Sequence, residues 1–133
     1  MATIRKEILI NAPPHEVWDV IRDVGAIHTR FAPGYVLDTR LEEGGGARIV
    51  TFANGTIVRE RIVTLDNDAR RLAYAVVDGR ASHHNASFQV FPTSDGHTSL
   101  VWITDVLPDT VGPTFAGMIE GGAAAIKRTF EAH

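Results

Sequence analysis

The chain has 133 residues, of which 44% are hydrophobic and 22% charged, and its net charge is −3. This length fits a single domain over residues 1–133 with a sizeable core, and the slight acidity gives no reason to expect nucleic acid as a partner. Because cysteine is absent, disulfides, thiol nucleophiles and zinc–thiolate sites are excluded. No apolar run approaches the ~20 residues of a membrane span, and the N-terminus lacks the apolar core of a signal peptide, so we expect a cytoplasmic protein.

The N-terminal quarter predicts one strand and two short helices. Thr3 to Asn11 alternates between apolar and polar residues, as a strand does, before two prolines interrupt it. Pro14 suits a first helical turn, and His15 to Arg22 then carries apolar residues at helical spacing. A second short helix is expected from about Val24 to Phe31.

Six further segments read as strands separated by turns rich in Gly, Asn and Asp. The Asn54-Gly55 pair is a strong hairpin signal, because both residues tolerate a positive φ. The regular spacing of these turns indicates an antiparallel meander. The expected strands are Tyr35–Leu41, Ala47–Phe52, Thr56–Leu65, Arg71–Val77, His83–Phe91 and Thr98–Leu107.

The chain closes with a helix, roughly Asp109 to Ala132, whose inward stripe contains both large and very small residues. Phe115, Ile119 and Ile126 fall on one face of the helix, with Gly122 in the middle of that face. A glycine inside a helix costs ~1 kcal/mol relative to alanine. We interpret the gap as the roof of a pocket; the alternative is close packing between the helix and a sheet.

The order of elements, β-α-α-β₆-α, predicts an α+β fold. In it, a curved seven-stranded antiparallel sheet wraps around the long C-terminal helix. One helix fills the inner face of such a sheet only in part, so the remaining volume is expected to form a cavity.

Three segments resemble a known family: INAPPHEVWDVIRD, RERIVTLDNDARRLAYAVVDG and GHTSLVWITDVLPD. They are similar to the START-like (SRPBCC) superfamily, and within it to the polyketide cyclase/dehydrase and lipid-transport group. The resemblance covers essentially the whole chain and implies the helix-grip, Bet v 1-like fold of the birch pollen allergen. Members of this superfamily bind lipids, hormones, quinones or polyketides, and some are enzymes.

The middle segment also resembles the plant abscisic acid receptors. A Glu-Arg pair there precedes a Leu-Asp turn, and Glu60-Arg61 with Leu65-Asp66 matches that pattern. The receptor glutamate lies in the ligand cavity, which implies the same for Glu60. The basic cavity residue of the receptors has no counterpart, since the nearest positions are Leu37 and Asp38.

The twofold periodicity of strands selects the side chains expected to face the cavity. An inward Glu60 places Arg59 and Arg61 in solvent. On the last strand both faces are apolar, and we favour the phase that points Trp102 inward. The expected ligand-binding residues are Val58, Glu60, Ile62, Tyr74, Val76, His84, Ala86, Phe88, Trp102, Thr104, Phe115, Met118, Ile119 and Gly122.

Glu60 and His84 are the candidate catalytic residues. Burial among apolar neighbours raises the pKa of a carboxyl group, as acid/base chemistry requires, and a histidine with a free lone pair can move protons. Alternatively, Glu60 only pairs with a polar neighbour such as Tyr74 or His84, and His84 is a surface histidine. The histidines show no metal-ligand spacing, so neither a metal nor another cofactor is expected.

Three functions remain open. The first is the binding of a small hydrophobic, aromatic or lipid-like molecule for transport or sensing. The second is a polyketide cyclase or dehydratase that uses Glu60, with or without His84, and the third is an interaction domain with a vestigial cavity. The small number of ionisable cavity residues favours binding. The sequence identifies neither the ligand nor the oligomeric state.

Overall fold

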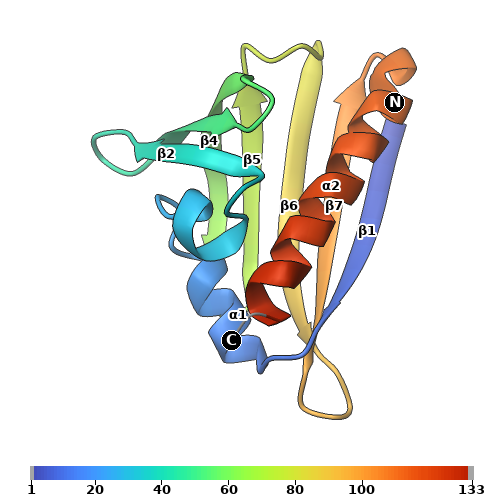
Figure 1. The fold of residues 1–133 in the computed structure, drawn as a ribbon. Helices are drawn as coiled ribbons and strands as arrows, with labels where there is room; N and C mark the ends of the chain where they lie inside the picture. Colours follow the sequence, from blue (N-terminus) through green and yellow to red (C-terminus); the bar gives the residue numbers. More distant parts are fainter. Residues whose placement is uncertain (1, 132–133) are drawn as a thin grey trace.

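A computed structural model of the chain describes residues 2–131, and it consists of one curved antiparallel sheet with helices on its concave side (Figure 1). The seven strands are ordered β1-β7-β6-β5-β4-β3-β2, so only the β1–β7 pairing joins strands distant in sequence. The strands are β1 (Ala2–Ile10), β2 (Val36–Leu41), β3 (Ala47–Phe52), β4 (Ile57–Asp66), β5 (Arg71–Val77), β6 (His83–Pro92) and β7 (Thr98–Leu107).

The helices follow the expected order, and their bounds differ from the expected ones by up to three residues; Ala132, the expected end of the last helix, lies outside the described residues. Helix α1 spans Pro14–Ile21, and the second short helix is only a π-helical turn, η1 (Ile27–Phe31), because a turn precedes it. The C-terminal helix α2 spans Gly112–Glu131 and follows a 3₁₀ turn, η2 (Asp109–Val111). Its second residue is a proline, whose missing N–H has no helical partner in a first turn anyway.

Helix α2 lies lengthwise over the β1 side of the concave face (Figure 1). Two lysines fix it to β1: Lys6 pairs with Glu120 at 3.0 Å, and the ammonium of Lys127 donates to the carbonyl of Leu9 at 2.8 Å. Helix α1 and η1 cover the other part of the face, below β4 and β5 in this view. The concave side is therefore covered by two separate pieces of helix with the core between them.

The faces of the strands follow the expected alternation. On β6, Ala86, Phe88 and Val90 are buried, whereas His83 is exposed. On β7, Trp102 points inward and its ring stacks on Phe88 with centroids 4.7 Å apart. Both faces of this strand are apolar, so the sequence alone did not decide which face points inward. The stacking of Trp102 on Phe88 decides it. None of the helices within residues 2–131 is long and apolar enough to cross a membrane.

Candidate functional site

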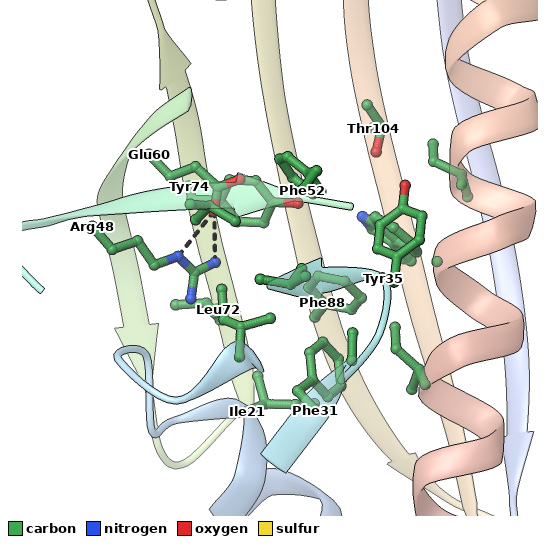
Figure 2. A pocket seen from close by; sticks show the side chains of 18 of the residues that line it. Ile21, Phe31, Tyr35, Arg48, Phe52, Glu60, Leu72, Tyr74, Phe88 and Thr104 are labelled. Atoms are coloured by element: carbon green, nitrogen blue, oxygen red, sulfur yellow. Dashed lines mark hydrogen bonds and ion pairs between the residues drawn. The ribbon is translucent and has the colours of Figure 1, made fainter. Parts of the chain in front are cut away.

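A cavity of about 90 Å³ lies between the sheet, α2 and the α1–η1 segment. The wall is largely apolar and includes seven aromatic side chains apart from His84, contributed by η1, the strands, the connection before β2, and α2 (Figure 2). The strands present their inward residues here because their alternation is in phase across the sheet. These aromatic residues are Phe31, Tyr35, Phe52, Tyr74, Phe88, Trp102 and Phe115, among which Tyr35 and Tyr74 also carry hydroxyl groups.

The polar centre of the cavity is an ion pair between Arg48 on β3 and Glu60 on β4. Both side chains are almost completely buried, with exposed fractions of 3% and 5% for the two residues. The Nε and Nη2 atoms of Arg48 each lie 2.9 Å from Oε1 of Glu60 (Figure 2). A buried charge is tolerated only when it is paired, and each member of this pair supplies the partner that the other needs.

Arg48 also connects the sheet to the segment that covers it. Its Nη1 donates to the carbonyl of Val24, between α1 and η1, at 3.2 Å. The guanidinium carbon lies 5.2 Å from the centroid of the Tyr74 ring, a cation–π distance. A single side chain thus contacts β4, β5 and the covering segment at the cavity wall.

The pair changes the acidity of the cavity residues. Burial raises the pKa of the Glu60 carboxyl, and the Arg48 guanidinium opposes that rise. Protonation of Glu60 would leave Arg48 as a buried cation without a counter-ion, so both side chains are charged near neutral pH. Burial, together with the Glu60 charge, raises the pKa of the Tyr74 phenol, so its hydroxyl stays protonated.

The Arg48 cation was not expected from the sequence, which placed Glu60 in the cavity without a positive partner. The basic cavity residue is thus Arg48 on β3, whereas the expected nearest positions, Leu37 and Asp38, supply no cation. The hairpin between β3 and β4 could have predicted this cation. The backbone N–H of Phe52 donates to the carbonyl of Thr56 across the turn at Asn54, and this register sets Arg48 directly opposite Glu60. Directly opposite residues of an antiparallel pair point to the same face.

His84 on β6 lies on the cavity wall, where its ring meets Phe115 of α2 edge to face with centroids 4.8 Å apart. Burial, and secondarily the neighbouring His83, lowers the pKa of His84 to about 4. The imidazole is therefore neutral near neutral pH. Glu60 and His84 lie on β4 and β6, with β5 between them, so their backbones are about 10 Å apart.

The space over Gly122 is occupied, contrary to the expected gap. A β-carbon at this position would lie 2.9 Å from Cη2 and 3.0 Å from Cζ3 of Trp102, and 3.3 Å from Cε2 of Tyr35. The Tyr35 hydroxyl in turn donates to the carbonyl of Met118 at 2.7 Å. Gly122 therefore permits close packing of two aromatic rings against α2, which is the alternative that the sequence left open.

The remaining expected residues divide into two groups. The cavity wall includes Glu60, Tyr74, His84, Phe88, Trp102, Thr104, Phe115, Met118, Ile119 and Gly122. Four others lie on the same strands without lining the cavity: Val58, Ile62, Val76 and Ala86. Val58, Ile62 and Val76 are partly buried residues of β4 and β5 that pack against the core, and Ala86 is buried within that core.

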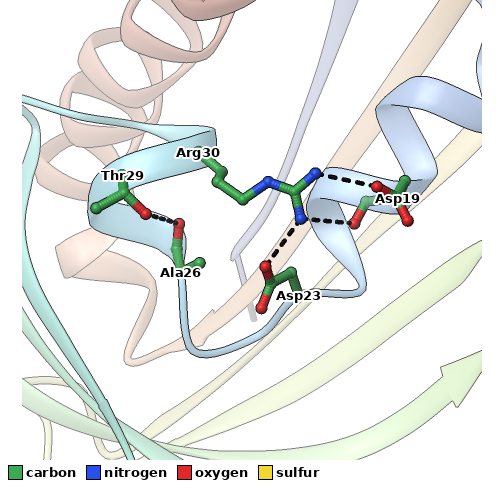
Figure 3. A network of polar contacts seen from close by, with 5 residues as sticks. All are labelled: Asp19, Asp23, Ala26, Thr29 and Arg30. Carbon is green, nitrogen blue, oxygen red and sulfur yellow. Dashed lines mark hydrogen bonds and ion pairs between the residues drawn. The ribbon is translucent and has the colours of Figure 1, made fainter.

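The segment from α1 to β2 supplies cavity residues that the sequence analysis missed, including Ile21, Phe31 and Tyr35 (Figure 2). Outside the cavity, Arg30 fastens this segment: its guanidinium contacts Asp23 at 2.8 Å and Asp19 at 3.0 Å (Figure 3). Helical spacing identifies the apolar residues of such a segment but not the direction in which the segment folds over the sheet.

Residues 1–131 match the model of the family described as polyketide cyclase / dehydrase and lipid transport. The chain belongs to this family, as its sequence motifs predicted. No curated protein sequence matches the chain significantly.

Solved structures show the same helix-grip fold. Protein XoxI from Bacillus cereus is 23% identical with a TM-score of 0.86, over 98% of this chain and 96% of that chain. A protein from Thermobifida fusca is 29% identical with a TM-score of 0.78, over 96% and 89%. Norcoclaurine synthase from Thalictrum flavum, solved with dopamine and hydroxybenzaldehyde, is 21% identical with a TM-score of 0.74, over 99% and 87%. The α+β architecture is thus shared with Bet v 1-like proteins.

Proposed function

We propose that the protein binds one small, mainly apolar molecule containing a ring, in the cavity between the sheet, α2 and the α1–η1 segment. The observation that carries this proposal is the buried Arg48–Glu60 pair in the wall of an aromatic cavity. Ligand sites are typically apolar hollows with a few polar groups that orient the ligand. The membership in a family of lipid-transport and cyclase proteins supports a binding role.

The size of the cavity favours a compact ring over a long acyl chain. Its volume is about 90 Å³, whereas an engineered apolar cavity of about 150 Å³ accommodates benzene. A single ring requires only modest adjustment of the walls. A lipid or a polyketide would require the α1–η1 segment or α2 to move away from the sheet.

The aromatic wall provides a direct binding assay, because Trp102 lines the cavity and Trp18 does not. Trp18 instead lies on α1 and donates its indole N–H to Asn67 at 3.0 Å. In a Trp18→Phe variant, toluene should change the Trp102 fluorescence in a saturable way with one site per chain. A Trp102→Phe variant that keeps Trp18 should show no such change. A folded Trp18→Phe protein that gives no saturable signal with toluene would refute the proposed site.

A catalytic role is the second candidate, and the position of His84 favours it. The imidazole lines the same cavity as Glu60 and is neutral near neutral pH, so it has a lone pair available for a proton. Such a base would remove an α-proton from a small ketone to give an enolate and an imidazolium, and the imidazolium would exchange its proton with solvent and return one to the enolate. Deuterium incorporation into cyclopentanone in D₂O, followed by NMR, tests this role.

The matched control is the exposed neighbour His83. If His84 is the base, His84→Asn abolishes the protein-dependent exchange and His83→Asn preserves it. Equal exchange in both variants would remove His84 from the candidate catalytic residues and leave binding as the function.

A further inference from the structure

The polar atoms around the Arg48–Glu60 pair include both a free acceptor and free donors. Glu60 accepts both contacts from Arg48 through Oε1, and Oε2 has no hydrogen-bond partner within residues 2–131. Nη1 and Nη2 of Arg48 each carry a second N–H, for which the described part of the chain likewise offers no partner. The pair therefore presents an acceptor and donors side by side at the cavity wall.

Trp102 adds a further donor to the same cavity. Its Nε1 atom is buried without a hydrogen-bond partner among the described residues. A buried polar group without a partner is costly, and a ligand atom would supply the missing contact.

The charges at this site cancel. Arg48 contributes one positive charge and Glu60 one negative charge, and the other wall residues near them are uncharged aromatic and aliphatic side chains. His84 is neutral near neutral pH, and Asp23, the one other acidic residue of the wall within residues 2–131, pairs with Arg30. An added carboxylate or ammonium would therefore be a buried charge without a counter-ion.

We infer that the cavity selects a ring molecule with an uncharged hydroxyl group, such as a phenol, over a carboxylate or ammonium of the same shape. A hydroxyl donates to Oε2 of Glu60 and accepts from the free N–H groups of Arg48, whereas a carboxylate only accepts and an ammonium only donates. Glu60 and Arg48 are thus the residues that determine specificity. This inference rests on the proposed function, because it names the ligand class of the same cavity.

The test compares four ligands of similar shape by calorimetric titration: toluene, 4-methylphenol, 4-methylbenzoate and 4-methylbenzylamine. Near neutral pH the phenol is uncharged, and the last two carry opposite charges. The wild-type protein should bind the phenol at least roughly tenfold more tightly than either ion. The phenol should also bind no more weakly than toluene, because its hydroxyl finds partners.

The outcomes separate this inference from the proposed function. If toluene binds but either ion binds as tightly as the phenol, the inference fails and the proposed function stands. The inference also fails if the phenol binds about tenfold more weakly than toluene, since its hydroxyl would then be desolvated without a partner. If none of the four ligands binds, the proposed function fails together with the inference.

Variants of Glu60 test which residue sets the preference. Glu60→Gln keeps the size of the side chain and leaves Arg48 as the only charge of the pair, so 4-methylbenzoate should become the preferred ligand. The matched control is Glu42→Gln, which removes a carboxylate paired with Arg59 at 2.8 Å away from the cavity and should leave the preference for the phenol unchanged.

A second variant covers the case in which Glu60→Gln does not fold. The double variant Arg48→Gln/Glu60→Gln has no charge at either position, and it should still prefer the phenol to both ions. A preference for 4-methylbenzoate in the double variant would show that other groups select the charge of the ligand, which would overturn the assignment.

Discussion

At the scale of single residues, the Arg48–Glu60 pair links the stability of the fold to the chemistry of the cavity. Removing water from two charges is expensive, and an ion pair rarely stabilises a protein more than well-packed apolar residues would. Among residues 2–131, the pair also leaves one carboxylate oxygen and two N–H groups without partners. These features are better suited to contacting a ligand than to maximising stability.

The energetics of the pair can be measured with a double-mutant cycle. Arg48→Met should destabilise the fold by about 3–5 kcal/mol, because it leaves Glu60 buried without a partner. The double variant Arg48→Met/Glu60→Met should recover most of this loss or exceed wild-type stability. Urea unfolding of the four proteins gives the coupling free energy.

The comparison variant for this cycle is Arg59→Met, whose partner Glu42 lies near the surface. An exposed ion pair contributes little to stability, so this variant should unfold nearly as the wild type does. Additive effects of the Arg48 and Glu60 substitutions would contradict a dry, tightly coupled pair.

His84 makes stability depend on pH. Its pKa is about 4 in the folded protein and about 6.5 in the unfolded chain, so between these values the unfolded state binds the additional proton. The contribution of His84 to stability is thus complete above about pH 6.5 and is lost as the pH falls toward 4. The loss is on the order of 1–2 kcal/mol, allowing for its partial exposure.

Thermal or urea unfolding across this pH range checks the effect. His84→Gln should show a smaller decrease in stability on acidification than the wild type, and His83→Gln should behave as the wild type does. If all three proteins lose the same stability between pH 6.5 and 4, the imidazole of His84 is hydrated in the folded state and its low pKa is wrong.

At the scale of elements, the glycines of α2 have opposite surroundings. A β-carbon at Gly122 would meet the ring of Trp102 at 2.9 Å, and that ring is already stacked on Phe88. A β-carbon at Gly117 would meet none of the described residues within 4 Å. Gly122→Ala should therefore destabilise the fold by about 1–3 kcal/mol through overpacking, whereas Gly117→Ala should gain up to about 1 kcal/mol of helix propensity.

The thermal melts of these two single variants test how α2 sits on the sheet. A Gly122→Ala protein as stable as Gly117→Ala would mean that Trp102 and Tyr35 leave the helix easily. The open space assumed from the sequence would then exist over Gly122 in solution.

The strands were predictable because turns delimit them. The bounds of three strands, Ala47–Phe52, Arg71–Val77 and Thr98–Leu107, coincide with those of β3, β5 and β7, and the other strands differ by one residue at one end or at both ends. The second helix was predicted too long, because the apolar residues of η1 follow helical spacing for only one turn. Local sequence patterns predict a long helix or strand well. They do not predict the length of a single helical turn that tertiary contacts hold in place.

The candidate site was only partly predictable, because local sequence patterns do not show which side chains tertiary packing brings together. Strand alternation brings Glu60, Tyr74 and Trp102 to one face, and the sequence sufficed for that. Arg48 required the register of the β3–β4 hairpin as well as its faces. Tyr35 reaches the cavity from a connection between elements, where no periodicity predicts the direction of a side chain.

At the scale of the whole molecule, the sheet, α2 and the α1–η1 segment enclose a cavity whose residues come from nearly every element of the chain. The covering segment is held by Arg48 from inside, through the Val24 carbonyl, and by Arg30 from outside. If a ligand binds in the proposed cavity, its occupancy should stabilise the folded protein by mass action.

The outer face of the sheet offers the competing place for an apolar molecule. Ile57 and Val63 on β4 are 63% and 62% exposed, and Leu37 on β2 is 57% exposed. Weak, nonspecific association would involve these residues rather than the cavity, so the location of a bound ring distinguishes the two cases.

The most direct test of the account is a ¹H–¹⁵N NMR titration of the folded protein with toluene. We predict saturable shifts that fit one site and are largest at residues of the cavity wall, including the Trp102 indole and the amides of Glu60 and Gly122. Shifts that do not saturate, or that centre on Ile57 and Val63, would contradict a ligand-binding cavity in this protein.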